Sequence, residues 1–241
     1  MKKSYEHEDF TFGRYSEYLN SLAEKRTFCD FDSFETDTVF LRHDVDVSPQ
    51  RALLMAKLEH EKNIKATYFF QFSSIFYNLL EKDHIKILHL IKSLGHNIAL
   101  HFEPFETKAK NLKMLAAEKN LLESISESEV RCFSWHNPND DILNMLPEEN
   151  LCGMFNIYSL LKQEDINYIS DSNGYWRFKD MNKVIDENHS RMHVLIHPVW
   201  WQDEVMTPYD RILRSTKGRA LNTEEQYCQL LKGANRENIK L

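Results

Sequence analysis

The sequence predicts an α/β fold, either a barrel or a closely related layered arrangement. Short apolar runs rich in β-branched and aromatic residues recur along the chain, and stretches with helical periodicity separate them. Neither an internal repeat nor a linker interrupts this alternation, which is typical of parallel strands joined by helices. The seven candidate strands are residues 38–43, 66–71, 97–102, 130–135, 154–157, 167–170 and 192–197.

The stretches between the strands carry the start and stop signals of helices. Ser48 can cap a helix whose first turn holds Pro49, where a missing N–H costs nothing. A second helix is predicted over residues 81–94 and ends at Gly95, which can adopt the left-handed conformation. A third is predicted over residues 112–125, and a short one near residues 224–231.

The length of 241 residues and the 42% hydrophobic content fit one domain, 1–241. We expect residues 1–36 to form a helical cap over the core or a subunit contact. Residues 37–201 should form the strand-rich core, and residues 202–241 a C-terminal helix with a polar tail.

Composition and charge exclude several classes of protein. With only 6 Gly, widely spaced, the chain has no dinucleotide-binding turn and no phosphate-binding loop. The net charge of -7 argues against a nucleic-acid partner. No apolar run is long enough to span a membrane, and the first residues lack the apolar segment of a signal peptide, so we expect a cytoplasmic protein. The 4 Cys form no C-x-x-C motif and are expected to be free thiols.

Polar side chains gather where the candidate strands end. Asp44 and Asp46 follow the first strand, and His101, His136 and His197 end three others. Because the carboxyl ends of parallel strands share one rim, these residues should converge. A lone aspartate would more simply cap a helix or pair with a neighbouring cation. Two carboxylates with several histidines favour a metal or acid–base site.

The tryptophans flank the same polar clusters. Trp135, Trp176, Trp200 and Trp201 all lie close to strand ends in the sequence. Aromatic rings beside polar groups suit a ligand with apolar faces and a hydroxylated edge, such as a sugar. The alternative is a packing role, which we expect for one of the pair at 200 and 201.

Four segments together resemble a known family. The segments are LRHDVDVSP (41–49), KATYFF (65–70), GHNIALH (95–101) and LIHP (195–198), and their order and spacing are similar to those of the polysaccharide deacetylase superfamily. The resemblance implies a deformed (β/α)7-type barrel and a divalent-metal-dependent hydrolase that removes acetyl groups from sugars.

The resemblance also implies roles for individual residues. Asp44 matches the catalytic base, Asp46 the metal-binding aspartate, His101 the first metal histidine and His197 the general acid. The segment from Asp171 to Trp176 corresponds loosely to the one that orients this acid and walls the pocket.

Two positions depart from the family pattern. Phe105 stands where the family has its second metal histidine, and the arginine that follows the fourth strand is missing. The third ligand could be His136, Glu103 or His43, and we favour His136 because it ends a strand on the proposed rim. The expected metal is zinc, with cobalt, manganese or iron as alternatives.

The expected partner is an acetylated sugar, attached to a nucleotide or lipid carrier in surface-polysaccharide synthesis. Two alternatives stay open: a metal-free carbohydrate-binding pseudoenzyme, and a hydrolase of another C–N bond. The oligomeric state is left open. The residues expected to stack on the sugar or hydrogen-bond to it are Arg42, Trp135, Asn137, Asp171, Asn173, Trp176 and Trp200.

Overall fold

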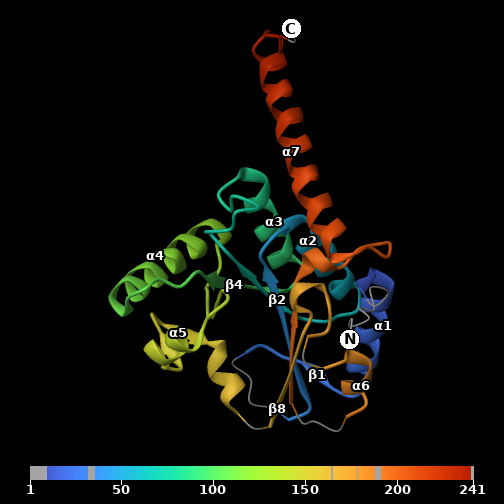
Figure 1. Ribbon diagram of the computed structural model, residues 1–241, viewed down its shortest axis with the longest axis vertical. Coiled ribbons are helices and arrows are strands. Elements are labelled where there is room, and N and C mark those ends of the chain that lie inside the picture. Colours follow the sequence, from blue (N-terminus) through green and yellow to red (C-terminus); the bar gives the residue numbers. More distant parts are fainter. Residues whose placement is uncertain (1–9, 32–35, 164, 178, 188–190, 240–241) are drawn as a thin grey trace.

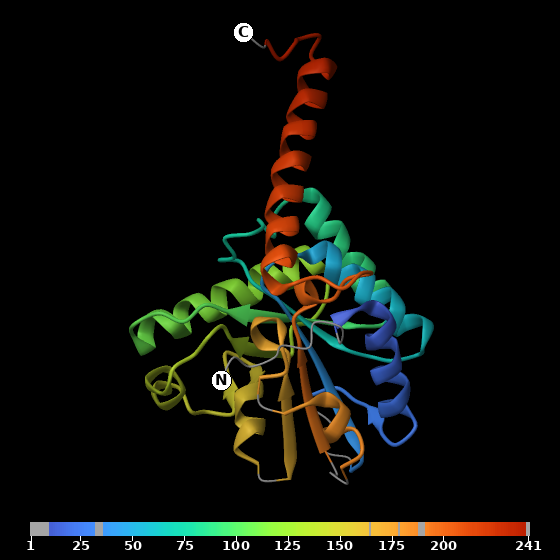
Figure 2. The same ribbon diagram turned by 45° about the vertical axis from the view of Figure 1, so that its right-hand side comes forward.

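A single curled β-sheet forms the centre of the molecule, with helices around it (Figure 1). The computed structural model describes residues 10–31, 36–163, 165–177, 179–187 and 191–239. Helices α2, α3 and α4 pack side by side against the sheet, and α7 projects away from it (Figure 2).

Seven parallel strands make up the body of the sheet, in the order β7-β5-β4-β3-β2-β9-β8. A two-residue strand, β6 (Asn150–Leu151), runs antiparallel at the β7 edge, and β1 (Thr27–Phe28) pairs with the start of β2. Among the described strands, the edge strand β8 pairs with β9 alone. The curled sheet is therefore open at this edge and forms a half-barrel. The predicted deformed α/β barrel is confirmed. The seven strands are β2 (Thr38–Val45), β3 (Thr67–Phe70), β4 (Asn97–Phe102), β5 (Cys132–Trp135), β7 (Met154–Asn156), β8 (Ile166–Ser170) and β9 (Arg191–Ile196).

The three predicted core helices are present. Helix α2 (Pro49–Glu61) begins where the Ser48 side chain accepts a hydrogen bond from Arg51 N at 3.3 Å. Helix α3 (Lys82–Ser93) is followed by Gly95 with a φ of 92°. Helix α4 (Lys108–Ser126) starts four residues before the expected range because Thr107 caps it.

The segment before β2 packs against helix α2 and the turn after β9. Helix α1 (Phe12–Ala23) contacts α2, and Phe12 N donates to Gln202 O at 2.8 Å. Phe10 and Tyr15 are buried against Trp201. Of the expected cap over residues 1–36, residues 1–9 and 32–35 lie outside the described residues.

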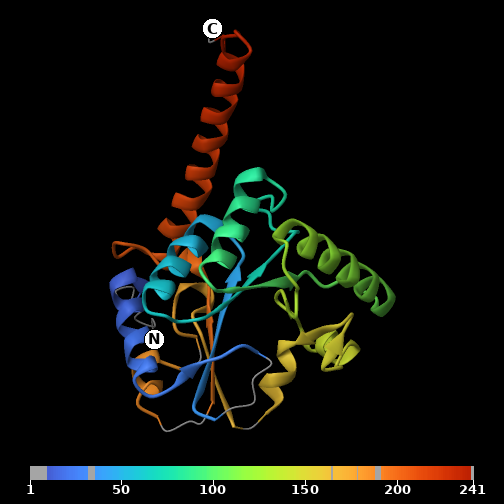
Figure 3. The ribbon, with the colours of Figure 1, turned by 180° about the vertical axis from the view of Figure 1, so that it is seen from behind.

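The C-terminal helix is much longer than predicted. Helix α7 (Pro208–Gly233) has 26 residues, starts at the cap Thr207 and projects from the body (Figure 3). The prediction was too short because it followed apolar periodicity, and the first half of α7 is rich in polar residues. The remaining helices are α5 (Asp140–Met145) and α6 (Met181–Val184), with 3-10 turns at Ile157–Lys162, Ser172–Gly174 and Pro198–Trp200.

The core is continuous and includes charged groups. All eight residues of β2 are buried, among them Arg42, His43 and Asp44. Charged side chains are rarely buried without a partner. Their presence on the central strand therefore indicates a functional site in addition to a packing role. None of the described helices has both the length and the apolar character needed to cross a bilayer.

Candidate metal and catalytic site

The polar residues predicted at the strand ends meet at one cavity. It has a volume of about 260 Å³ and lies at the carboxyl ends of the strands. Its walls include Asp44, Asp46, His101, His136 and His197. These residues come from β2, β4, β5 and β9 or from the turns directly after them, which parallel pairing brings to one rim.

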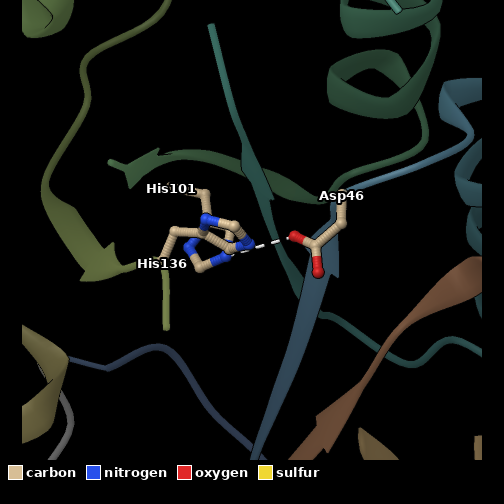
Figure 4. A group of neighbouring side chains, drawn as sticks. All are labelled: Asp46, His101 and His136. Carbon is tan, nitrogen blue, oxygen red and sulfur yellow. Dashed lines mark ion pairs between the residues drawn. The ribbon is translucent and has the colours of Figure 1, made fainter. Parts of the chain in front are cut away.

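Three of these side chains form a compact group. The ligand atoms of Asp46, His101 and His136 all lie within 4.8 Å of one another (Figure 4). His101 Nε2 is 3.2 Å from Asp46 Oδ1. That oxygen is buried and has no hydrogen-bond partner. A buried carboxylate oxygen that accepts no hydrogen bond and faces two imidazoles is an arrangement that a cation would complete.

The far side of each imidazole is held by a second group. His101 Nδ1 lies 2.7 Å from Ser134 Oγ, and His136 Nδ1 contacts the Glu103 carboxylate. Gln71 Nε2 in turn donates to Glu103 Oε2 at 2.9 Å. A proton on Nδ1 leaves Nε2 with its lone pair, which is the usual arrangement behind a metal-binding histidine.

The other candidates for a third ligand lie elsewhere. Phe105 is absent from the cavity walls, packs on Phe102, and donates its N–H to Asn111 Oδ1 at 2.7 Å. His43 points to the opposite face of β2, with its Nε2 2.7 Å from the buried Glu59. Glu103 contacts Nδ1 of His136 and is absent from the cavity walls. The role of His136 as the third ligand stays a prediction, with this geometry in its favour.

Arg42 holds Asp44 from within the same strand. The two residues are two apart on β2, so their side chains share a face. Arg42 Nε donates to Asp44 Oδ1 at 2.6 Å and Nη2 to Oδ2 at 2.5 Å, and both side chains are buried. The Arg42 side chain is 1% exposed and faces Asp44, an arrangement that does not favour the predicted contact of Arg42 with substrate.

His197 is held in the same way by Asp171. His197 Nδ1 lies 2.6 Å from Asp171 Oδ1, and Trp201 Nε1 donates to Oδ2 at 2.9 Å. Asp171 is wholly buried beneath the imidazole, which fits the acid-orienting role that the resemblance implies better than the predicted contact with substrate. Burial alone would lower the pKa of His197, but the Asp171 carboxylate outweighs it and raises the pKa to about 9.

Electrostatics favour the charged form of Asp46. Burial would raise the pKa of this carboxyl, yet His101, His197 and His136 together hold it well below its usual range. His197 Nε2 lies 3.8 Å from Asp46 Oδ2, so the imidazole edge faces the carboxylate across the cavity.

Of the tryptophans predicted to stack on a sugar, the structure brings Trp135 to the cavity and places the other two elsewhere. Trp135 is wholly buried between Phe102 and Phe133. Trp176 and Trp200 are absent from the cavity walls. Trp176 packs on residues that are distant in the sequence, including Phe10, Tyr18 and Trp201. Trp200 packs instead against Gly174, where an added Cβ would lie 3.2 Å from the indole ring.

Asn173 also lies outside the cavity, and its neighbour Ser172 takes part in the wall. Asn137 lines the cavity, and its contact with a sugar stays a prediction; its φ is 42°, which asparagine tolerates better than most residues.

Two tyrosines and an arginine that the sequence did not indicate also belong to the walls. Tyr158, Tyr168 and Arg177 line the cavity. Tyr158 donates its O–H to Trp135 O at 3.2 Å, and burial raises the pKa of Tyr168 to about 12. Alternation along β8 could have indicated Tyr168, because it lies two residues before Ser170 on the same face.

Comparisons with known proteins find similarity at the level of structure. No protein-family model and no curated protein matches the chain. A chitin deacetylase from the fungal pathogen Colletotrichum lindemuthianum matches with a TM-score of 0.49 and 12% identity, over 77% of this chain and 83% of that one. A family 4 acetyl xylan esterase from Clostridium thermocellum, in complex with a cobalt ion, matches with 0.44 and 17%, over 75% and 84%.

A CE4 family pseudoenzyme from Bacillus anthracis matches with a TM-score of 0.45 and 13% identity, over 77% of this chain. The chain spans 60% of the length of that pseudoenzyme, and 63% of the length of a mutant with restored enzymatic activity. These solved structures carry names from the same group of deacetylases and esterases that the sequence motifs resemble.

Proposed function

We propose that this chain is a divergent polysaccharide deacetylase, a divalent-metal-dependent hydrolase that removes an acetyl group from an acetylated sugar. The observation that carries the proposal is the meeting of Asp46, His101 and His136 beside two further groups, Asp44 and His197, each gripped by a buried partner of opposite charge.

The donor set suits a divalent ion. Two imidazole nitrogens and one carboxylate oxygen are a common ligand set of catalytic zinc, which keeps a fourth position open. Cobalt, manganese and iron accept the same donors. A bound ion would polarise the acetyl carbonyl and lower the pKa of a water molecule. The buried Asp46 Oδ1, which accepts no hydrogen bond and lies 3.2 Å from His101 Nε2, is the observation in the structure that fits such an ion best.

The remaining roles follow from position and charge. Asp44, on the same rim, is the group to accept the proton of the attacking water, and Arg42 fixes the orientation of its carboxylate. The raised pKa of His197 favours its protonated form, whose Nε2 is the group to donate a proton to the departing amine or alcohol. Asp171 keeps the imidazole in place through Nδ1. The products are acetate and the free amine or hydroxyl.

The cavity walls support a sugar substrate. Tyr158 and Tyr168 offer ring surfaces, and Asn137 offers an amide that can hydrogen-bond to hydroxyls. Arg177 is exposed at the edge of the cavity. A cation there suits a substrate that also carries an anionic group, as a nucleotide-linked or lipid-linked sugar does.

The direct test is acetate release from a panel of acetylated sugars by protein loaded with zinc or cobalt. Acetate release that a chelator abolishes and added metal restores would support the proposal. Asp44→Asn should lose this activity and keep the metal. Binding of acetylated sugars without acetate release would identify a carbohydrate-binding pseudoenzyme, and release from another C–N bond alone would identify a different hydrolase.

A further inference from the structure

Helix α7 stands away from the rest of the molecule for much of its length. Its 26 residues correspond to about 39 Å of helix, and all three ribbon views show its C-terminal half rising clear of the sheet (Figures 1, 2 and 3). Arg211 is buried at its base, and Arg219 reaches Glu81 at 2.5 Å. Beyond Arg219, the side-chain hydrogen bonds of the described residues stay within α7 or run to the segment after it.

Helix α7 carries a stripe of apolar and small residues along most of its length. They recur at alternating steps of four and three, the spacing of a helix that pairs with another helix. Tyr209, Tyr227 and Leu230 are 72%, 54% and 73% exposed. We call this set the α7 stripe: Tyr209, Leu213, Thr216, Ala220, Thr223, Tyr227 and Leu230.

The two threonines of the α7 stripe fit an apolar surface. Thr216 Oγ1 donates to Ile212 O at 3.1 Å, and Thr223 Oγ1 donates to Arg219 O at 2.9 Å. Their hydroxyls are thus satisfied by the preceding turn, and a partner helix would have no polar group to desolvate there.

Six residues of the α7 stripe are exposed and Leu213 is half-buried, while Thr216 and Ala220 also border a groove between α7 and the body of the molecule. Successive residues of a helix are rotated by about 100°, so Arg211, buried against the body, lies opposite Ala220 of the stripe. An amphipathic helix normally turns its apolar side to the core. Here most of that side is exposed, so a second surface is expected to cover it.

Charges beside the α7 stripe indicate what that surface is. Lys217 and Glu224 are exposed, lie seven residues apart along the same edge, and have no ion-pair partner among the described residues. When two copies of a helix pair antiparallel, the same heptad position of each meets along one edge. Lys217 of each copy would then face Glu224 of the other. In a parallel pair Lys217 would face Ile212, and Glu224 would face Arg219, which Glu81 already engages.

We infer that α7 is a self-association element, and that a second copy of this chain pairs with it in antiparallel orientation around a two-fold axis. Leu213 of one copy packs on Leu230 of the other, and Ala220 packs on Thr223. Two ion pairs between Lys217 and Glu224 flank this seam. The inference is independent of the proposed function, since no residue of the α7 stripe lines the candidate site.

The first experiment measures the mass of the full chain in solution by light scattering over a dilution series. The expected result is twice the mass of the chain, with dissociation on dilution. Leu230→Asp should shift the protein to monomer. Leu221→Asp is the matched control, because Leu221 is 67% exposed but lies outside the α7 stripe. Far-UV circular dichroism checks that both variants stay folded.

The second experiment tests orientation by charge reversal. Lys217→Glu and Glu224→Lys should each raise the dimer dissociation constant on the order of tenfold, because two attractions become two repulsions. The double variant Lys217→Glu/Glu224→Lys should restore the original value. Glu225→Lys, the same charge change on the next residue and off the seam, should have little effect.

Three outcomes would overturn the inference. The first is a monomer at every concentration. The second is a dimer that Leu230→Asp does not weaken, or that the double reversal does not rescue. The third is a monomer that binds vesicles of anionic phospholipid through Leu230, which would make α7 a membrane-surface helix.

Discussion

Asp44 and His197 are each held in place by a buried residue of opposite charge. Each faces the cavity and is gripped from behind by a buried partner of opposite charge, Arg42 or Asp171. Such partners fix the orientation of the two side chains. Removing either partner would leave a buried charge without its counterpart. The sequence motifs resemble a family in which an arginine after the fourth strand is expected, and here the structure has an arginine on β2 beside the carboxylate.

His136 should be required for metal binding. Replacing it by alanine removes one of three ligands, so His136→Ala is expected to lower zinc affinity by about 100-fold or more and to abolish acetate release. Phe105→Ala is the matched control, because Phe105 stands where a ligand was expected but faces away from the cavity. Titration calorimetry with zinc measures both. Equal zinc affinity in His136→Ala and the unmodified protein would rule out His136 as a ligand.

Removing Arg42 should destabilise the fold. Arg42→Met leaves the Asp44 carboxylate buried without its partner, which is expected to lower the free energy of unfolding by about 3–5 kcal/mol. Lys108→Met breaks the Lys108–Glu148 pair, whose side chains are 49% and 45% exposed. This substitution should change the free energy of unfolding by less than about 0.5 kcal/mol. Urea denaturation compares the two. If both substitutions changed the free energy of unfolding by a similar small amount, the buried Arg42–Asp44 pair would contribute little to stability.

At the scale of elements, the parallel strands were predicted best. Strands buried on both faces appear as continuous apolar runs, and β4 matches its predicted range of residues 97–102. The two-residue strands β1 and β6 were missed, because so short a pairing depends on the neighbouring strand and leaves no periodicity.

The convergence of the site could be predicted from the sequence, but the direction of several side chains could not. Parallel topology brings strand ends to one rim whatever the side chains do, which is why Asp46, His101 and His136 meet. Trp176 also lies near the rim in the sequence. Its direction is set by Phe10 and Tyr18, contacts more than 150 positions away that no local pattern encodes.

Helix α4 carries a carboxyl group whose titration should affect stability. Burial, with a smaller contribution from Glu103, raises the pKa of Glu118 to about 7 from 4.5. The folded state therefore favours the protonated acid, and stability should fall as the pH rises from about 4.5 to about 7. Glu118→Gln, which mimics the protonated acid, should raise the free energy of unfolding by about 1–2 kcal/mol above this window.

The comparison at a pH below the window is the internal control for Glu118→Gln. There both states bind the proton, so the substitution should change stability little. Thermal denaturation followed at both pH values gives the two differences. An equal gain at both would show that the effect is one of packing and that the carboxyl does not titrate as described.

At the scale of the whole molecule, metal binding should stabilise the fold, because the ligands come from β2, β4 and β5 and meet only in the folded chain. Zinc at 100 times its dissociation constant should add about 2.7 kcal/mol to the free energy of unfolding. The Tm should rise by roughly 5–10 °C for a chain of this size. His136→Ala should remove most of this rise. Thermal denaturation with and without zinc makes the measurement, and an unchanged Tm would speak against a native metal site.

The central claim is that Asp46, His101 and His136 together hold a divalent ion. The most direct measurement is an anomalous difference map from a crystal of this protein soaked in zinc. The account predicts one strong peak, bonded to a carboxylate oxygen of Asp46 and to Nε2 of both histidines at about 2.0–2.2 Å. No peak at this rim, or a peak that leaves His136 unbound, would contradict it.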